Sequence, residues 1–335
     1  MPVNVNGIKI SYGMPAAAVL PLDRAPGGQV PRSASQPPVT PSSPAGLVIL
    51  AYLRTHTEEM KSLDPMVRRD EPDAVHQMRV TTRRLRSTLR SFPHILHREG
   101  TRRLAAELKW LGSVLGEARD AEVLAGHLQA ELKRTAPEQV IGPIQARVQG
   151  RFASVRAAAR TQLLAALGSD RYFSLLDDLD WLLDDPPFTA HAAMPAAEVL
   201  PAAARQPWER AGRQMHRARG LAAGQLRDEA LHRARKAARR ARYASEAVSP
   251  AVGKQARRFT SQMKKVQSIL GEHQDAVIVR QVARDLGISA HLAGENAFSY
   301  GLLYERDVCH GQRLQVQAQR AWKRASRPHY LRWMR

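Results

Sequence analysis

Positively charged side chains recur at helical spacing within residues 73–92, DAVHQMRVTTRRLRSTLRSF. An α-helix turns by about 100° per residue. At that angle, five cationic or ionisable side chains fall within an arc of about 80° on one side of the helix. We call this set the first arginine stripe: His76, Arg79, Arg83, Arg86 and Arg90. The apolar residues of the segment fall on the opposite side. Because the sequence contains no Asp or Glu between Asp73 and Glu99, no acid within the helix neutralises the stripe. Guanidinium groups bind phosphate oxygens through paired hydrogen bonds, so we expect the stripe to bind an anion.

The pattern returns 156 residues later in LHRARKAARRARYASEAV (231–248). We call its equivalent cations the second arginine stripe: His232, Arg235, Arg239, Arg240 and Arg242. Lys236 lies on the same helix. A second repeat relates residues 101–124 to residues 256–279 and adds further candidate anion-binding cations: Arg102, Arg103, Lys109, Arg257, Arg258, Lys264 and Lys265. These recurrences predict an internal duplication.

The length and composition of the stripes narrow the class of anion. His76 to Arg90 spans about 21 Å at 1.5 Å per residue, which suits a linear polyanion better than one phosphate. Neither helix carries the mixture of Asn, Gln and Arg that reads base edges, and aromatic residues are not interleaved with the arginines to stack on bases. We therefore expect an anion without bases. A nucleic-acid-binding helical protein is the alternative that the charge alone leaves open.

Catalytic chemistry is weakly indicated. The pairs Glu117/Asp120 and Glu272/Asp275 could serve acid–base or metal chemistry, or could hold nearby arginines in register, which we favour. His76 and His232 can donate to phosphate oxygens, but their surroundings lack metal-ligand spacing. The sequence contains no nucleophile–base motif or P-loop. We predict a non-enzymatic protein without catalytic residues, metal or cofactor; a metal-dependent enzyme that processes phosphate polymers is the less favoured alternative.

The composition of the chain limits the classes of partner and the compartment that we expect. The chain has 335 residues, with 51 Lys and Arg against 31 Asp and Glu and a net charge of +20. This excess favours an anionic partner: nucleic acid, an anionic membrane surface or a phosphate polymer. A single cysteine, Cys309, excludes an intrachain disulfide and suggests a reducing compartment. Because no apolar run is long enough to span a bilayer, we predict a cytoplasmic protein without a membrane partner.

The predicted fold is all-α: two tandem four-helix bundles related by an internal pseudo-two-fold duplication. Helices are expected at 46–63, 72–92, 100–134 (with an interruption near Gly116), 138–167, 171–185, 197–220, 228–247, 251–286 and 292–324. The expected domains are a Pro-rich disordered or extended leader (1–45), a first bundle (46–168), a connecting helix and linker (170–196), a second bundle (197–325) and a basic tail (326–335). Small residues on the second stripe helix, Ala234, Ala237, Ala238 and Ala241, suggest that the duplicated helices lie near the centre.

The motifs VHQMRVTTRRLRSTL and LGEARDAEVL, with their second copies LHRARKAARRARYASEA and LGEHQDAVIV, resemble the CHAD family, a domain named for its histidines and α-helical content. The resemblance covers about 46–325. It implies two four-helix bundles around a central basic cavity that binds inorganic polyphosphate, and an association with polyphosphate granules. The residues that it implies as the lining are His76, Arg79, Arg83, Arg84, Arg86, His232, Arg235, Arg239, Arg240 and Arg242.

Two features depart from the family pattern. Some members carry an upstream CYTH (triphosphate tunnel) domain, and we expect this chain to lack it because only the leader precedes the bundles. Glu246 stands where the first copy has Arg90, so it either shortens the second stripe or pairs internally. Metal chelation was also proposed for the family, but the spacing here does not favour it.

Overall fold

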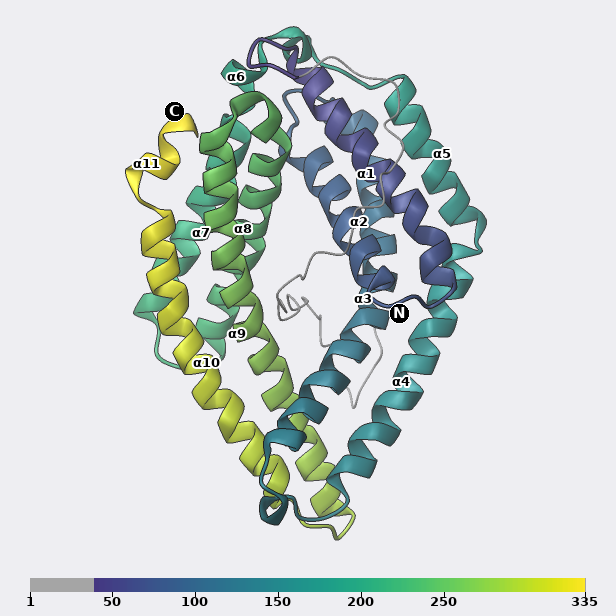
Figure 1. Ribbon diagram of the computed structural model, residues 1–335, viewed down its shortest axis with the longest axis vertical. Helices are drawn as coiled ribbons and strands as arrows, with labels where there is room; N and C mark the ends of the chain where they lie inside the picture. The colour runs from purple at the N-terminus through teal and green to yellow at the C-terminus, as the bar shows by residue number, and fades with distance from the viewer. Residues whose placement is uncertain (1–38, 335) are drawn as a thin grey trace, which may run out of the picture.

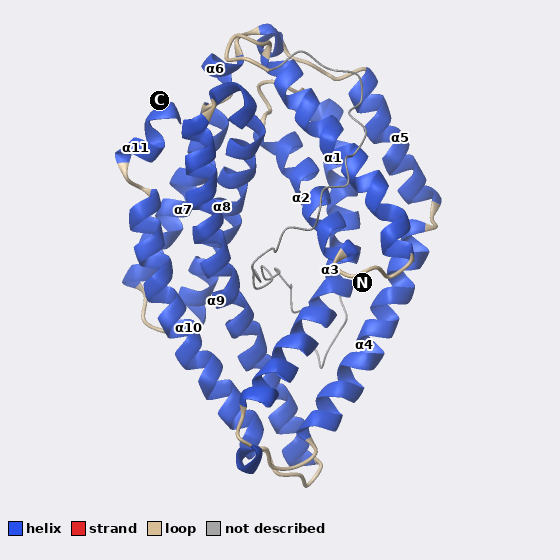
Figure 2. Cartoon of the chain, in the orientation of Figure 1, coloured by secondary structure: helices blue, strands red, loops and turns tan. Residues whose placement is uncertain are grey.

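The computed structural model describes residues 39–334, and every regular element among them is a helix (Figures 1 and 2). The long helices are α1 (Ala45–Arg68), α2 (Ala74–Ser91), α3 (Arg98–Arg134), α4 (Ile144–Leu167), α5 (Asp170–Asp184), α7 (Ala202–Gly220), α8 (Gln225–Val252), α9 (Lys254–Leu292) and α10 (Phe298–Ala325). The short ones are α6 (Ala196–Val199), α11 (Pro328–Leu331) and the 3₁₀ turns Pro137–Gln139, Ala190–Ala193 and Arg332–Met334. The predicted all-α class is confirmed. The predicted leader, up to residue 38, lies outside the described residues.

The helices form two groups that meet at both ends (Figure 1). On one side, helices α1 to α4 each contact the next helix in the chain, and α5 packs against them. On the other side, helices α7 to α10 each contact the next helix in the chain. Helix α8 also contacts α1 and α2, and α9 contacts α3. No helix among residues 39–334 is long and apolar enough to cross a membrane.

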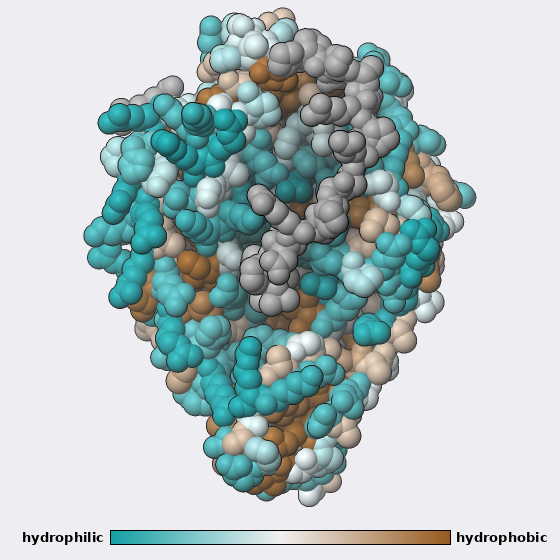
Figure 3. Space-filling view, viewed as in Figure 1, coloured by the Kyte–Doolittle hydropathy of each residue, from teal (hydrophilic) through white to brown (hydrophobic). Residues whose placement is uncertain are grey.

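Two hydrophobic clusters hold these groups together. The larger one joins residues such as Met78 of α2 and Phe259 of α9. The smaller one is formed where α3, α4, α9 and α10 converge, and it includes Leu128, Phe152 and Leu286. Figure 3 shows apolar surface near that lower end. Leu292, the last residue of α9, is exposed. Since both clusters contain residues from both halves of the sequence, apolar burial joins the halves. Their pseudo-two-fold relation stays a prediction.

Helix α2 presents the two faces that its sequence predicts. Its apolar residues Met78, Leu85 and Leu89 are buried, and Phe92 is buried just after its end. The opposite face therefore turns the first arginine stripe away from the apolar core. Helix α8 buries alanines in the equivalent places, including Ala234 and Ala238, and small side chains allow close approach of neighbouring helices.

Two predicted features are wrong: the end of the first helix at residue 63 and the interruption near Gly116. Helix α1 continues through Pro65 to Arg68, because Arg160 of α4 donates to the carbonyl oxygens of Val67 (2.7 Å) and Arg68 (2.9 Å) and so satisfies the C-terminal turn. Helix α3 is unbroken at Gly116, which instead leaves room for a side chain of α2.

The second half also differs from the predicted boundaries. Helix α8 passes Pro250 and is joined to α9 through Gly253 alone, whose φ of 82° favours glycine. After α5, the predicted connecting helix and linker (170–196) contains the 3₁₀ turn Ala190–Ala193 and two isolated β-bridges, which pair Pro195 with Pro44 and Phe188 with Leu96. The predicted basic tail is folded onto the helices, since Trp333 is buried and makes an edge contact with Phe259.

Candidate functional site

Arg79 is the most deeply placed cation of the first arginine stripe. Its residue is only 6% exposed, and its Nη1 lies 3.6 Å from Asp120 Oδ1 of α3. A Cβ atom added to Gly116 would lie 3.1 Å from Arg79 Nη2, so the glycine provides the space that the guanidinium occupies. Burial lowers the pKa of Arg79 to about 9 although Asp120 raises it, and Arg83 and Arg235 lower it further. One carboxylate therefore does not offset the charges around Arg79.

Arg235 occupies the equivalent position on α8 and is only 3% exposed. Burial lowers its pKa to about 10, Asp275 of α9 opposes that shift, and Arg83 adds to it. Both repeats therefore bury an arginine beside an aspartate from the next helix.

The two stripes meet in one group, which we call the central arginine cluster: Arg79, Arg83, Arg235 and Arg239. Burial lowers the pKa of Arg239 well below its usual value, and Arg83, Arg235 and Arg79 lower it further. Among residues 39–334, neither Arg83 nor Arg239 forms an ion pair. The tertiary structure thus brings like charges from α2 and α8 together without matching acids at these two side chains. Such a cluster is destabilised by self-repulsion until an anion binds.

Tyr243 lies among these cations and was missed by the sequence analysis, which found no interleaved aromatic residue. It is only 2% exposed, and the Arg242 guanidinium lies 5.0 Å from its ring centroid. Burial raises the pKa of Tyr243, but Arg83, Arg242, Arg239 and Arg84 lower it by more. Its position directly after Arg242 was the available signal. Because the ring is buried, it supports the arginines and cannot stack on a base.

A second group of cations, which we call the outer arginine group, contains Arg86, Arg90, Arg210 and Arg240. Burial lowers the pKa of Arg86, and Arg90 and Arg240 lower it further. Burial likewise lowers the pKa of Arg240, assisted by Arg90 and Arg210. Arg210 comes from α7, outside both sequence repeats, and only the packing of α7 on α8 places it here. Lys236 keeps an exposed surface, but the partial burial of its amine lowers its pKa, and the charges of Arg239 and Arg240 lower it further.

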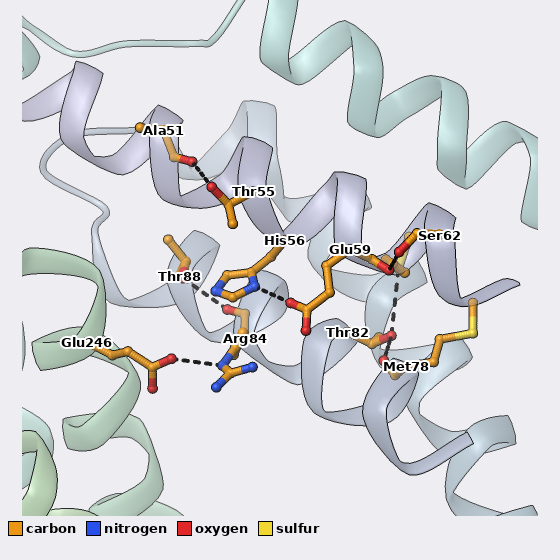
Figure 4. Close-up of polar contacts among 11 residues, drawn as sticks. Ala51, Thr55, His56, Glu59, Ser62, Met78, Thr82, Arg84, Thr88 and Glu246 are labelled. Carbon is orange, nitrogen blue, oxygen red and sulfur yellow. Dashed lines mark hydrogen bonds and ion pairs between the residues drawn. The ribbon is translucent and has the colours of Figure 1, made fainter. Parts of the chain in front are cut away.

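Arg84 and Arg242 have a different environment. Arg84 Nε lies 2.9 Å from Glu246 Oε1, and Arg242 Nε lies 3.6 Å from Glu246 Oε2 (Figure 4 shows the Arg84 contact). Arg242 Nη1 also donates to Gln267 of α9 at 3.1 Å. Burial lowers the pKa of Arg84, but Glu246, Tyr52, Tyr243 and Glu59 together raise it by more, so the net shift is upward. Glu246 therefore pairs internally, and these two arginines connect α2, α8 and α9.

His76 and His232 are half-buried at the starts of their stripes. Burial lowers the pKa of His76 to about 4. The charges of Arg119, Arg83 and Arg79 also lower it, and the charge of Asp73 raises it. Burial lowers the pKa of His232 to about 4 as well, with Lys236 and Arg235 assisting. The Nδ1 atom of each makes no hydrogen bond to any residue that the structure describes. Both imidazoles are neutral at pH 7 and each can donate one hydrogen bond.

The remaining candidates lie on α3 and α9 and are exposed: Arg102, Arg103, Lys109, Arg257, Arg258, Lys264 and Lys265. At about 100° per residue, Arg102 and Lys109 share a face of α3 with Gly116 and Asp120, and their repeat equivalents Arg257 and Lys264 do so on α9. This face leads from the central arginine cluster toward the N-terminal ends of both helices. Arg103 lies off it and points to α5, where its Nη2 is 3.4 Å from Asp178 Oδ2.

The arrangement provides concentrated positive charge. In the described part of the chain, no three His, Cys, Asp or Glu side chains gather closely enough to hold a metal ion. A cavity of about 440 Å³ between α3 and α4 is lined by residues that include Ala118, Phe152 and Arg156, and by none of the four arginines of the central arginine cluster. The guanidinium groups of the cluster can donate paired hydrogen bonds to an anion.

Comparison with known proteins gives one family match and two relatives. The family described as CHAD domain matches residues 51–284. MT2285 and Rv2226, uncharacterized proteins of Mycobacterium tuberculosis strains CDC 1551 and H37Rv, are each 36% identical over 298 residues, which cover 89% of this chain and 55% of each relative. The chain thus spans about half the length of these relatives.

Two solved structures share the fold. PptA from Streptomyces chartreusis superposes with a TM-score of 0.70 at 23% identity, over 84% of this chain and 100% of that one. The crystal structure of the CHAD domain from the plant Ricinus communis gives a TM-score of 0.65 at 25% identity, over 90% and 98% of the two chains.

Proposed function

The chain belongs to the CHAD domain family, and from this membership and the central arginine cluster we propose that it binds inorganic polyphosphate as a non-catalytic module. The observation that carries the proposal is the convergence of Arg79 and Arg83 of α2 with Arg235 and Arg239 of α8. The charge of Arg83 lowers the pKa of Arg79, Arg235 and Arg239, so these guanidinium groups lie close enough to repel one another. Only a ligand rich in negative charge relieves that repulsion at several positions at once.

The site has the length for a polymer. The central arginine cluster continues into the outer arginine group, and Arg79 and Arg90 are about 16 Å apart along α2 at 1.5 Å per residue. Consecutive phosphates can accept paired hydrogen bonds from arginines of both stripes. We further propose that the halves are pseudo-two-fold-related bundles and that the cations of α2, α3, α8 and α9 line a basic cavity between them. A cytoplasmic location remains part of this proposal.

The test is calorimetric titration of long-chain sodium polyphosphate at two salt concentrations, with transfer RNA as competitor. We expect affinity to fall with added salt, as it does for other polyanions that release counterions. We expect transfer RNA to displace polyphosphate poorly, because the described site offers arginines without exposed aromatic platforms. Displacement at equal phosphate concentration would instead favour a nucleic-acid binder. Release of phosphate from the polymer in the presence of Mg²⁺ would overturn the non-catalytic part.

A further inference from the structure

Two repeat-related carboxylates, Asp120 of α3 and Asp275 of α9, lie together where these helices contact. Both face one small space of about 20 Å³ that is also lined by Val123, His127 and Ile278. The Oδ1 atoms of Asp120 and Asp275 are buried and accept no hydrogen bond from residues 39–334. A buried carboxylate with an oxygen that accepts no hydrogen bond is costly in the charged form, so this environment favours the protonated forms.

Cations face these carboxylates from the stripe helices. Asp120 is faced by Arg79 and Arg83 of α2, by Arg235 of α8 and by Glu117 of its own helix. Burial raises the pKa of Asp120 to about 7, and the three arginines lower it only in part.

Asp275 is faced by Arg235, Glu272 and Asp120. Burial raises its pKa well above the usual value; Arg235 opposes this shift, and the two acids add to it. In the absence of a ligand, the charge of each carboxylate therefore depends on its neighbouring arginine.

We propose that Asp120 and Asp275 are internal counter-anions of the central arginine cluster and that they take up protons from solvent when polyphosphate binds. This inference rests on the proposed function. A phosphate group that engages Arg79 or Arg235 draws that guanidinium from its aspartate and places negative charge nearby. Both changes favour the protonated carboxyl group. Each step adds one proton to an aspartate oxygen, and no other bond changes.

The sign of the resulting pH dependence follows from linkage. Above about pH 7, Asp120 is ionised in the free protein and protonated in the complex, so the association constant falls as pH rises, by about tenfold per pH unit for each proton taken up. Below that pH Asp120 is protonated in both states and its contribution is flat. In the free protein the pKa of His76 and His232 is about 4, so both imidazoles are neutral at pH 8, where the protons are counted.

The test measures polyphosphate binding from pH 6 to pH 9 and counts protons at pH 8 by calorimetry in two buffers of different ionisation enthalpy. For the wild-type protein we expect uptake of about one to two protons and a loss of affinity above pH 7. Asp120→Asn should remove about one proton from the count and flatten the profile, and Asp275→Asn is the second variant. Asp180→Asn is the matched control, because Asp180 pairs with Lys61 at 2.5 Å on the α1–α5 surface.

Each outcome has a defined meaning. Tight binding by the wild-type protein without proton uptake would overturn this inference and leave the proposed function intact. Unchanged proton uptake in both folded variants would overturn the assignment to these aspartates. If one variant does not fold, the wild-type count and the other variant decide the question. Absence of polyphosphate binding at every pH would contradict the proposed function itself.

Discussion

Arg84 of α2 and Glu246 of α8 form an ion pair of 2.9 Å that joins the two halves of the chain. Their side chains are 21% and 24% exposed, so the contact is largely withdrawn from water. Glu246 stands where the first repeat carries Arg90, and it pairs with Arg84 and Arg242 instead of extending the second arginine stripe. Arg84 and Arg242 therefore connect helices through an acid. Arg83 and Arg239 differ from them, because they have no acid partner among the described residues.

Glu246→Gln should therefore destabilise the fold without weakening polyphosphate binding. Removing one partner leaves Arg84 partly buried and uncompensated, and we expect a loss of about 1–2 kcal/mol after allowance for solvent exposure. Urea unfolding followed by circular dichroism measures it, with Asp180→Asn as the surface control. A loss of affinity in the folded variant would place Glu246 in the binding site.

The double variant Arg83→Glu/Arg239→Glu should reduce polyphosphate affinity by more than about 100-fold, because two charge-assisted contacts are replaced by repulsion. The fold should persist, since the substitutions relieve crowding of like charge. Arg134→Glu/Arg284→Glu makes the same change in net charge at exposed positions of α3 and α9 and is the matched control. Equal losses in both double variants would mean that binding follows net charge and not this cluster.

Gly116→Ala should lower polyphosphate affinity by roughly 3- to 10-fold, a shift of about 1 kcal/mol, by moving the Arg79 guanidinium that would lie 3.1 Å from the new methyl group. Alanine also favours a helix interior over glycine by up to about 1 kcal/mol, so stability should not fall much. Gly126→Ala on the same helix meets nothing within 4 Å and should change stability alone. Equal affinities of the two variants would argue against a binding role for the position of Arg79.

The part of the stability of the unliganded protein that depends on His76 and His232 should decrease as pH falls from about 6.5 to about 4, whereas Asp120 and Asp275, whose pKa is raised, act in the opposite direction. Burial lowers the pKa of His76 and His232 to about 4 in the fold, so the unfolded chain takes up protons first in this range. Each histidine should contribute roughly 2 kcal/mol of this loss. Thermal unfolding of the wild-type protein and of His76→Gln/His232→Gln at several pH values measures it, and the variant should lose less stability toward pH 4 than the wild-type protein does. A curve of unchanged slope in that variant would assign the acid sensitivity to other groups.

Much of the fold followed from local pattern. Met78, Leu85 and Leu89 are buried as their spacing predicts, because the angle per residue in a helix decides which side chains share a face. Boundaries were less accurate at Pro65 and Gly116. There, contacts from other helices, through Arg160 and Arg79, decided whether the helix continued.

The sequence by itself determined the helical class, the duplicated stripes and the excess of positive charge, since these depend on residue type and spacing along single helices. Only the tertiary structure decided which arginines have acid partners: Arg79 has Asp120, Arg84 has Glu246, and Arg103 has Asp178. The tertiary structure also placed Arg210 in the outer arginine group and Tyr243 beside the central arginine cluster. The physical reason is that an ion pair between helices depends on how faces far apart in the sequence pack together. Helical periodicity describes which side chains share a face of one helix and carries no information about the packing between helices.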